Sequence, residues 1–203
     1  MAPPSSGSPP PSEDFARREL PVERIPAGTR FARIHHAEFD PLYFGSTEYN
    51  RFDDQGKRFG VCYLSKPIEG SFAETFVRAT SNRVRGVEFV QERSFSEIMA
   101  TAPLRLSSLH GPGLARIGAT SAVASGPYDV ARNWSRAIHD HPTVPDGIAY
   151  RSKHDDDEIC IALFDRARER VAAAGVPQPM MMDLARLAEL FARYGLALGR
   201  DWA

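Results

Sequence analysis

Apolar and polar residues recur with two different periods along this chain. Apolar positions that alternate with polar ones predict a strand with one buried face, and apolar positions four residues apart predict a helix. Short apolar or alternating runs predict strands at residues 30–34, 59–64, 84–91, 104–109, 147–151 and 158–164. The four-residue spacing, with proline or glycine near the ends, predicts helices at residues 67–77, 95–100, 113–117, 127–138, 165–174 and 180–194.

These elements follow one another irregularly, without the repeated crossovers of a parallel sheet. They predict an α+β fold with mixed or antiparallel sheets and flanking helices. The chain has 203 residues, of which 42% are hydrophobic, which is enough for one well-cored domain. Residues 1–20 are rich in proline and serine and predict a disordered tail, so a single compact domain is expected over residues 21–203.

The charge balance narrows the choice of partners. Lysine plus arginine number 25 and aspartate plus glutamate 26, for a formal net charge of −1. Proteins that bind nucleic acid directly usually carry a basic excess, so the balance disfavours such binding. No segment approaches the roughly 18 apolar residues of a membrane span, and no apolar secretory signal opens the sequence.

Cysteine usage indicates the compartment. Cys62 and Cys160 are the two cysteines, both in apolar runs and without a Cys-x-x-Cys partner. A disulfide scaffold of this length normally has more cysteines, so a reducing cytoplasm is expected. Both thiols are expected to be small buried hydrophobic groups rather than nucleophiles.

A long irregular segment, residues 35–54, separates the first two predicted strands. Residues that break regular structure occur throughout it, and so do five aromatic residues: Phe39, Tyr43, Phe44, Tyr49 and Phe52. A loop of this length is usually functional or disordered, and its aromatic content favours an ordered loop.

Residues 51–74 bring three kinds of chemistry close together. Arg51 precedes a predicted strand that carries Tyr63, and a predicted helix then carries Glu74. A fixed cation, an aromatic face and a lone carboxylate are the groups needed to hold and cleave a phosphorylated nucleoside. Arg33 and Ser152, which lie near the ends of other predicted strands, complete a candidate set of five.

Each of these residues also has a simpler explanation. The arginines suit a solvated surface, and Ser152 suits a turn. Tyr63 is a candidate core aromatic with a satisfied hydroxyl, and Glu74 is a candidate partner for Arg78 at the i, i+4 spacing, a pair worth only ~0.3 kcal/mol. It is their joint placement beside strand ends that favours a site.

Two other patterns carry less weight. Residues 139–141 and 154–158 are rich in histidine and acid, but no matching helical His-x-x-x-His accompanies them, so solvated loops are favoured and no metal site is predicted. Gly111-Pro112-Gly113 lacks the Gly-x-Gly-x-x-Gly order, and its proline removes an N–H that a phosphate would need. A Rossmann interpretation is therefore excluded.

A set of short motifs occurs in order over about residues 26–195: residues 27–34 (AGTRFARI), 51–53 (RFD), 61–65 (VCYLS), 72–75 (FAET), 104–106 (LRL), 113–118 (GLARIG), 146–152 (DGIAYRS) and 161–165 (IALFD). Each motif is weak alone, but the ordered set is specific. Together they resemble the RES domain family, which is named for its arginine, glutamate and serine.

The resemblance implies a fold similar to ADP-ribosyltransferases and the activity of a bacterial toxin that degrades NAD⁺. Such toxins hydrolyse or phosphorolyse the nicotinamide–ribose bond, so NAD⁺ is the expected substrate, with inorganic phosphate as co-substrate in the second case. No cofactor is expected. The partner implied is an antitoxin of the helix-turn-helix (Xre) type that covers the active site. Transfer of ADP-ribose to a protein, and a non-catalytic nucleotide-binding module, are the alternatives.

The family's functional positions fall on Arg33, Arg51, Tyr63, Glu74 and Ser152. In the mechanism that follows, the two guanidinium groups bind the pyrophosphate and Tyr63 borders the nicotinamide. Glu74 stabilises the positive charge that develops on the ribose, and Ser152 bonds a ribose or phosphate oxygen.

The chain departs from the family's pattern directly after its first arginine. The family often has an aromatic residue there, and this chain has Ile34. Tyr43 and Tyr49 are the candidates to replace it as a stacking partner.

Overall fold

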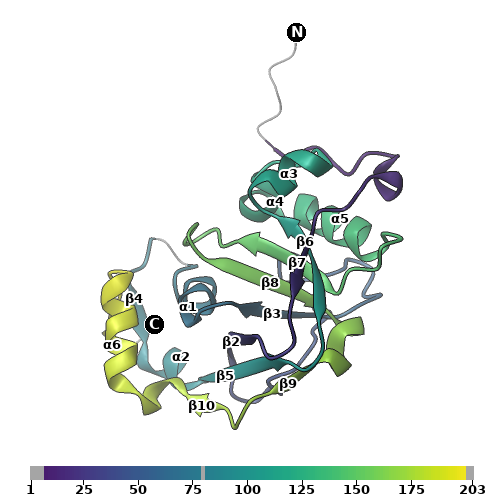
Figure 1. The fold of residues 1–203 in the computed structure, drawn as a ribbon. Coiled ribbons are helices and arrows are strands. Elements are labelled where there is room, and N and C mark those ends of the chain that lie inside the picture. The colour runs from purple at the N-terminus through teal and green to yellow at the C-terminus, as the bar shows by residue number, and fades with distance from the viewer. Residues whose placement is uncertain (1–6, 79–80, 200–203) are drawn as a thin grey trace.

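A nine-stranded mixed sheet runs through the computed structural model, which describes residues 7–78 and 81–199 (Figure 1). Its strands lie in the order β1, β6, β7, β8, β3, β2, β5 and β10, and β9 pairs with β5. Their bounds are β1 (Val22–Ile25), β2 (Arg30–His36), β3 (Val61–Ser65), β5 (Arg93–Ala100), β6 (Leu104–Leu109), β7 (Gly147–Arg151), β8 (Ile159–Phe164), β9 (Val171–Ala173) and β10 (Gln178–Pro179). Paired strands are antiparallel except β6 and β7, which are parallel. A separate parallel pair joins β4 (Val84–Gly86) to β11 (Ala197–Gly199).

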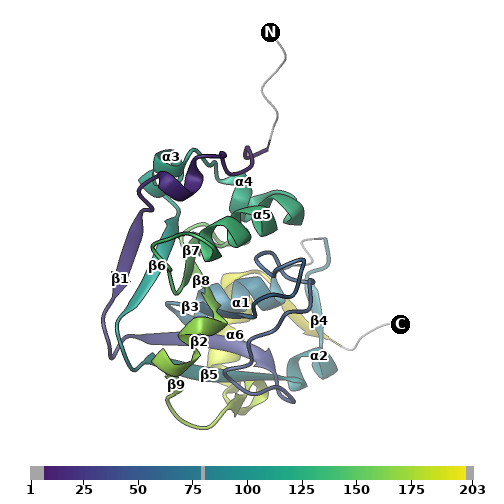
Figure 2. The same cartoon turned by 90° about the vertical axis from the view of Figure 1, so that its right-hand side faces the viewer.

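Two groups of helices flank the sheet (Figures 1 and 2). The first comprises α3 (Pro112–Ile117), α4 (Ala122–Ser125) and α5 (Tyr128–His139). The second comprises α1 (Ile68–Phe76), α2 (Val87–Gln91) and α6 (Leu184–Arg193). The 3₁₀ helices are η1 (Phe15–Arg17), η2 (Asp165–Arg170) and η3 (Met180–Met182). None of the helices in the described ranges is long and apolar enough to cross a membrane.

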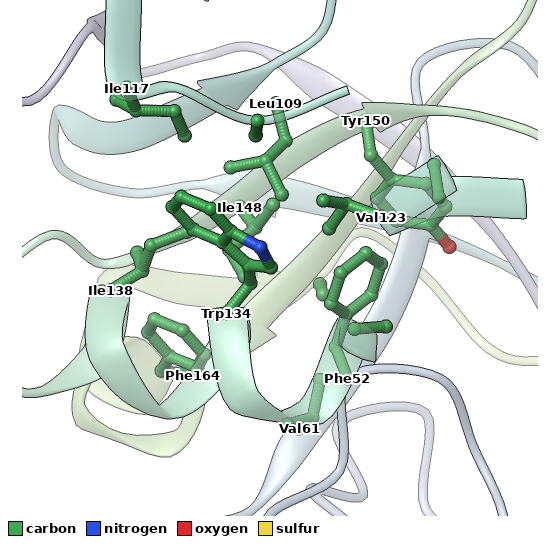
Figure 3. Close-up of a cluster of buried hydrophobic side chains, with 14 of the residues drawn as sticks. Phe52, Val61, Leu109, Ile117, Val123, Trp134, Ile138, Ile148, Tyr150 and Phe164 are labelled. Atoms are coloured by element: carbon green, nitrogen blue, oxygen red, sulfur yellow. The ribbon is translucent and has the colours of Figure 1, made fainter. Parts of the chain in front are cut away.

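An aromatic core joins the first group of helices to the sheet. Trp134 and Ile138 lie four residues apart on α5, so both face the same side and are fully buried. They cluster with Ile148 of β7 and Phe164 of β8 (Figure 3). Full burial of one such side chain contributes about 1.5–3 kcal/mol by transfer from water. This core fixes α5, and with it the loops at its ends, relative to β7 and β8.

The sheet opens between β2 and β3. These strands pair at one position, Ala32 with Ser65, whereas β2 pairs with β5 over all seven of its residues. Strand β3 in turn pairs with β8 along its whole length. Beyond Ala32 the facing edges of β2 and β3 therefore diverge, and the loop between the two strands lies between α5 and α2 in Figure 2.

The α+β class, with a mixed sheet and flanking helices, is confirmed by this architecture. Three predicted elements are wrong. Residues 95–100 belong to strand β5 rather than a helix, and residues 84–91 divide into β4 and α2. Residues 165–174 form the short helix η2 followed by strand β9.

The predicted tail also needs correction. Residues 1–6 lie outside the described residues, but residues 7–20 pack on the domain. Phe15 is 4% exposed, and its ring meets the ring of Trp134 edge-on at 5.3 Å. The indole Nε1 of Trp134 donates a hydrogen bond to the carbonyl of Pro9 (2.9 Å). Proline-rich composition hid these contacts because the segment is anchored at a few positions only, among them Phe15, Leu20 and the carbonyl of Pro9.

Phe15→Ala is expected to lower the free energy of unfolding by about 3 kcal/mol, the lower end for truncation of a buried phenylalanine. Denaturant-induced unfolding measures this loss. Arg17→Ala is the control, because Arg17 is exposed on the same short helix and its loss is expected to stay within about 0.5 kcal/mol. Equal stability of the two variants would mean that the packing of Phe15 on the domain adds nothing to its stability.

Candidate active site

A cavity of about 940 Å³ lies where β2 and β3 diverge. Four of the five candidate residues line it, each from a different element. Arg33 comes from β2, Tyr63 from β3, Glu74 from α1 and Arg51 from the loop between the two strands. The volume is within the range of small-molecule sites, which commonly occupy ~300–1,000 Å³.

The fifth residue, Ser152, reaches the site through Glu74. It follows β7, is 2% exposed, and its hydroxyl donates to Oε1 of Glu74 (2.7 Å). The hydroxyl oxygen of Ser152 also accepts a hydrogen bond from the backbone N–H of His154 (3.1 Å). The only proton of the hydroxyl is thus donated to Glu74, and Ser152 is not among the residues that line the cavity. The geometry makes Ser152 a group that orients Glu74 rather than a direct contact to a ligand.

The loop after Ser152 is held by the C-terminal helix. The hydroxyl of Tyr194, the residue that follows α6, donates to Oδ2 of Asp155 (2.7 Å). Arg193 pairs with Glu158 (3.2 Å) and Asp155 (3.4 Å). Burial raises the pKa of Tyr194, and the hydrogen bond to Asp155 raises it further, so the phenol stays protonated as a donor. The loop is solvated at Lys153, Asp156 and Asp157, as predicted, but Asp155 and Glu158 hold it against the C-terminal helix.

Arg51 is held rigidly although it belongs to a loop. It is 8% exposed, and Nη1 donates to the carbonyl of Gly126 (2.6 Å). Its guanidinium carbon lies 4.6 Å from the ring centre of Tyr128 at the start of α5, a cation–π geometry. Burial lowers the pKa of Arg51, but a guanidinium so far above neutrality keeps its charge.

The hydroxyl of Tyr63 is satisfied by hydrogen bonds, as expected if Tyr63 were a core aromatic residue. The hydroxyl donates to Oδ1 of Asp53 (2.9 Å) and accepts from the N–H of Phe52 (3.0 Å). Asp53 is fully buried, and its other oxygen accepts from the N–H of Asn50 (3.0 Å). Burial, followed by the charge of Asp53, raises the pKa of Tyr63, so the hydroxyl stays protonated. Tyr63 therefore lines the cavity, and its hydroxyl holds the loop that carries Arg51 in place.

Arg33 has spare hydrogen-bonding capacity. It is 8% exposed; Nη2 donates to the carbonyl of Tyr43 (3.2 Å) and Nη1 contacts the sulfur of Cys62. Its Nε is buried without a hydrogen bond to the described residues. A buried donor left unsatisfied costs about 1–3 kcal/mol. Because Arg33 lines the cavity, an anionic ligand there would pair with the charge of its guanidinium.

Three further residues that line the cavity were not among the five candidates from the sequence. Tyr128, Tyr150 and His154 all line the cavity. Burial, and then the charge of Glu74, raises the pKa of Tyr150, so its hydroxyl is neutral. Burial lowers the pKa of His154, so its imidazole is uncharged at neutral pH. Tyr150 stands two residues before Ser152, a signal available in the sequence, but nothing local distinguishes Tyr128.

The described residues hold no group of three histidine, cysteine, aspartate or glutamate side chains placed to bind a metal. The histidines of residues 139–141 have packing roles. His139 stacks on Phe59 at 3.9 Å between ring centres, and His141 meets Phe15 at 5.3 Å.

Comparison with known proteins identifies the family to which the chain belongs. Residues 22–185 match the RES domain, so the chain belongs to the RES domain family. It is 36% identical over 83 residues to the "Probable toxin y4kH" of Sinorhizobium fredii (strain NBRC 101917 / NGR234). That match spans 40% of this chain and 65% of the relative's length.

The fold is similar to that of a chain in the crystal structure of the M. tuberculosis MbcT–MbcA toxin–antitoxin complex. The TM-score is 0.67, over 89% of this chain and 98% of that one. At 14% identity, this likeness shows the fold alone.

Proposed function

We propose that this chain is the NAD⁺-degrading toxin of a toxin–antitoxin pair and that it cleaves the nicotinamide–ribose bond by hydrolysis or phosphorolysis. The observation that carries the proposal is the carboxylate of Glu74, which lines the cavity with Arg33 and Arg51 and is oriented by Ser152. Membership of the RES domain family and the toxin named among the relatives support it.

In the proposed reaction, the bond between the ribose C1′ and the nicotinamide nitrogen breaks, and its electron pair stays on nicotinamide. Nicotinamide leaves neutral, so no general acid is required. The ribose acquires oxocarbenium character, which the fixed negative charge of Glu74 stabilises. Water or phosphate then forms the new C1′–O bond, and water loses its proton to solvent. Arg33 and Arg51 neutralise the pyrophosphate, and the ring of Tyr63 borders the nicotinamide.

An antitoxin of the helix-turn-helix type is the proposed partner, and the cytoplasm the proposed location. The toxin–antitoxin complex named for the similar fold supports an antitoxin partner, and its helix-turn-helix type rests on the resemblance to the family. Two buried free cysteines agree with the cytoplasm. Binding of the purified chain to the product of a neighbouring gene that encodes such a protein tests this part of the proposal.

Purified, antitoxin-free protein is expected to release nicotinamide from NAD⁺. Nicotinamide and the ribosyl product are followed with and without inorganic phosphate. A rate that needs phosphate indicates phosphorolysis, and a rate independent of it indicates hydrolysis. A further assay uses NAD⁺ that carries a label on its adenosine. Labelled protein in this assay would reveal transfer of ADP-ribose. Unchanged NAD⁺ with well-folded protein would overturn the catalytic proposal and leave a nucleotide-binding module.

A further inference from the structure

Two aromatic rings form a separate part of the cavity wall. Phe39 and Tyr43 lie in the loop between β2 and β3, line the cavity, and are 50% and 40% exposed. Their ring centres are 5.0 Å apart and the planes are inclined by 14°, so the rings are stacked on each other. Large aromatic side chains usually bury most of their surface. Half-exposed rings that face a cavity have apolar surface available to a flat ligand.

The loop holds both rings in place. The N–H of Phe39 donates to the carbonyl of His36 (3.0 Å), and the N–H of Tyr43 donates to that of Asp40 (2.9 Å). Tyr43 also lies against Gly45, where an added Cβ would come within 3.1 Å of the ring carbon Cε1. The rings are therefore preorganised, and a ligand that stacks on them loses little affinity to side-chain ordering.

The position of the ring pair relative to the charges suggests its ligand. Nη2 of Arg33 donates to the backbone carbonyl of Tyr43 (3.2 Å), so the loop that carries the rings is hydrogen-bonded to a guanidinium with an unsatisfied buried Nε. The carboxylate of Glu74 comes from α1 and has Ser152 as its hydrogen-bond partner. A dinucleotide with its ribose at Glu74 and its phosphates on the arginines has a second base, and the rings provide an aromatic surface in the same cavity.

We infer that Phe39 and Tyr43 form the binding site for the adenine base of a dinucleotide, next to Arg33. The identity of that dinucleotide as NAD⁺ rests on the proposed function. Base–aromatic stacking contributes about 1–3 kcal/mol per base, which is about 5- to 150-fold in affinity. The site would thus favour a dinucleotide over nicotinamide mononucleotide, which lacks the adenosine half.

Calorimetric titration of the full chain with ADP and with inorganic pyrophosphate tests the inference. Phe39→Ala and Tyr43→Ala are each expected to raise the Kd for ADP by about 5- to 150-fold. The Kd for pyrophosphate is expected to stay the same, because Arg33 is held by the backbone carbonyl of Tyr43, which substitution retains. Tyr43→Phe and Phe39→Tyr are matched controls that keep an aromatic ring and should keep the affinity for ADP.

Three results would overturn the inference: no binding of ADP by the wild-type chain, unchanged affinity for ADP in both alanine variants, or an equal loss for pyrophosphate. A kinetic measurement distinguishes binding of the adenine end of the ligand from binding of its nicotinamide end. If the alanine variants lose as much kcat/KM on nicotinamide mononucleotide as on NAD⁺, the rings hold nicotinamide and the adenine assignment is wrong.

These measurements distinguish this inference from the proposed function. A chain that binds ADP through the rings but releases no nicotinamide has the adenine site and lacks the proposed activity. A chain that releases nicotinamide while its alanine variants bind ADP normally has the activity and lacks the adenine site.

Discussion

Glu74→Gln is expected to lower kcat for nicotinamide release by at least about 10²- to 10³-fold, the usual cost of removing one fixed group that stabilises transition-state charge. Glutamine has nearly the shape of glutamate and keeps an oxygen that can accept the hydrogen bond from Ser152. The substitution therefore removes the negative charge and leaves the packing of α1 in place. Because NAD⁺ is held mainly by Arg33 and Arg51 in the proposed mechanism, KM should change far less than kcat.

Glu69→Gln provides the matched control for this experiment. Glu69 lies in the first turn of the same helix and is not among the residues that line the cavity. Its kcat should equal that of the wild-type chain, and thermal unfolding should give similar Tm values for both variants. Full activity of a folded Glu74→Gln variant would remove the carboxylate from the mechanism and leave the cavity as a binding site.

Hydrophobic periodicity was enough to predict the strands whose buried faces are apolar. Residues 147–151 and 104–109 are predicted and found as β7 and β6. The helix predicted at residues 95–100 failed because the buried face of β5 carries Ser94 and Ser96 beside Ile98 and Ala100. His35 of the adjacent strand satisfies Ser96 with a 2.9 Å hydrogen bond. A buried face made of small and polar residues gives no apolar alternation, so only the neighbouring strand reveals it.

Four of the five candidate residues line the cavity, but the sequence did not predict their arrangement or the other residues that line it. Arg33, Arg51 and Glu74 carry chemistry that a sequence displays, and they meet because β2 and β3 part after a single pair. The divergence of two strand edges depends on long-range pairing that no local pattern encodes. For the same reason the cation–π contact between Arg51 and Tyr128 was missed, since these residues lie on separate elements.

The hydroxyl of Ser152 shows most clearly how the structure changes a predicted role. Its residue type suits a hydrogen bond to a ribose or phosphate oxygen, which was the role expected from the sequence. In the fold, the residue is 2% exposed and donates to Glu74 at 2.7 Å. The two roles predict different kinetics, because a ligand contact affects substrate binding whereas a positioning contact affects the chemical step.

Ser152→Ala is expected to lower kcat for nicotinamide release by about 10- to 150-fold, with KM for NAD⁺ nearly unchanged. A hydrogen bond to a charged group contributes about 1.5–3 kcal/mol, and each 1.4 kcal/mol is tenfold in rate. Without this donor, the carboxylate of Glu74 is free to rotate away from the ribose, while the arginines still bind the pyrophosphate. Steady-state kinetics with NAD⁺ measures both parameters. A rise in KM as large as the fall in kcat would restore the direct contact to substrate that the sequence suggested.

Two comparisons make the Ser152 result specific. Ser107 of β6 is also a fully buried serine, and its hydroxyl makes no hydrogen bond with the described residues, so Ser107→Ala should leave kcat unchanged. The double variant Glu74→Gln/Ser152→Ala should be no slower than Glu74→Gln alone, because residues that act as a unit are not additive. Additive losses would mean that Ser152 acts independently of Glu74, and the 2.7 Å hydrogen bond would then have no part in catalysis.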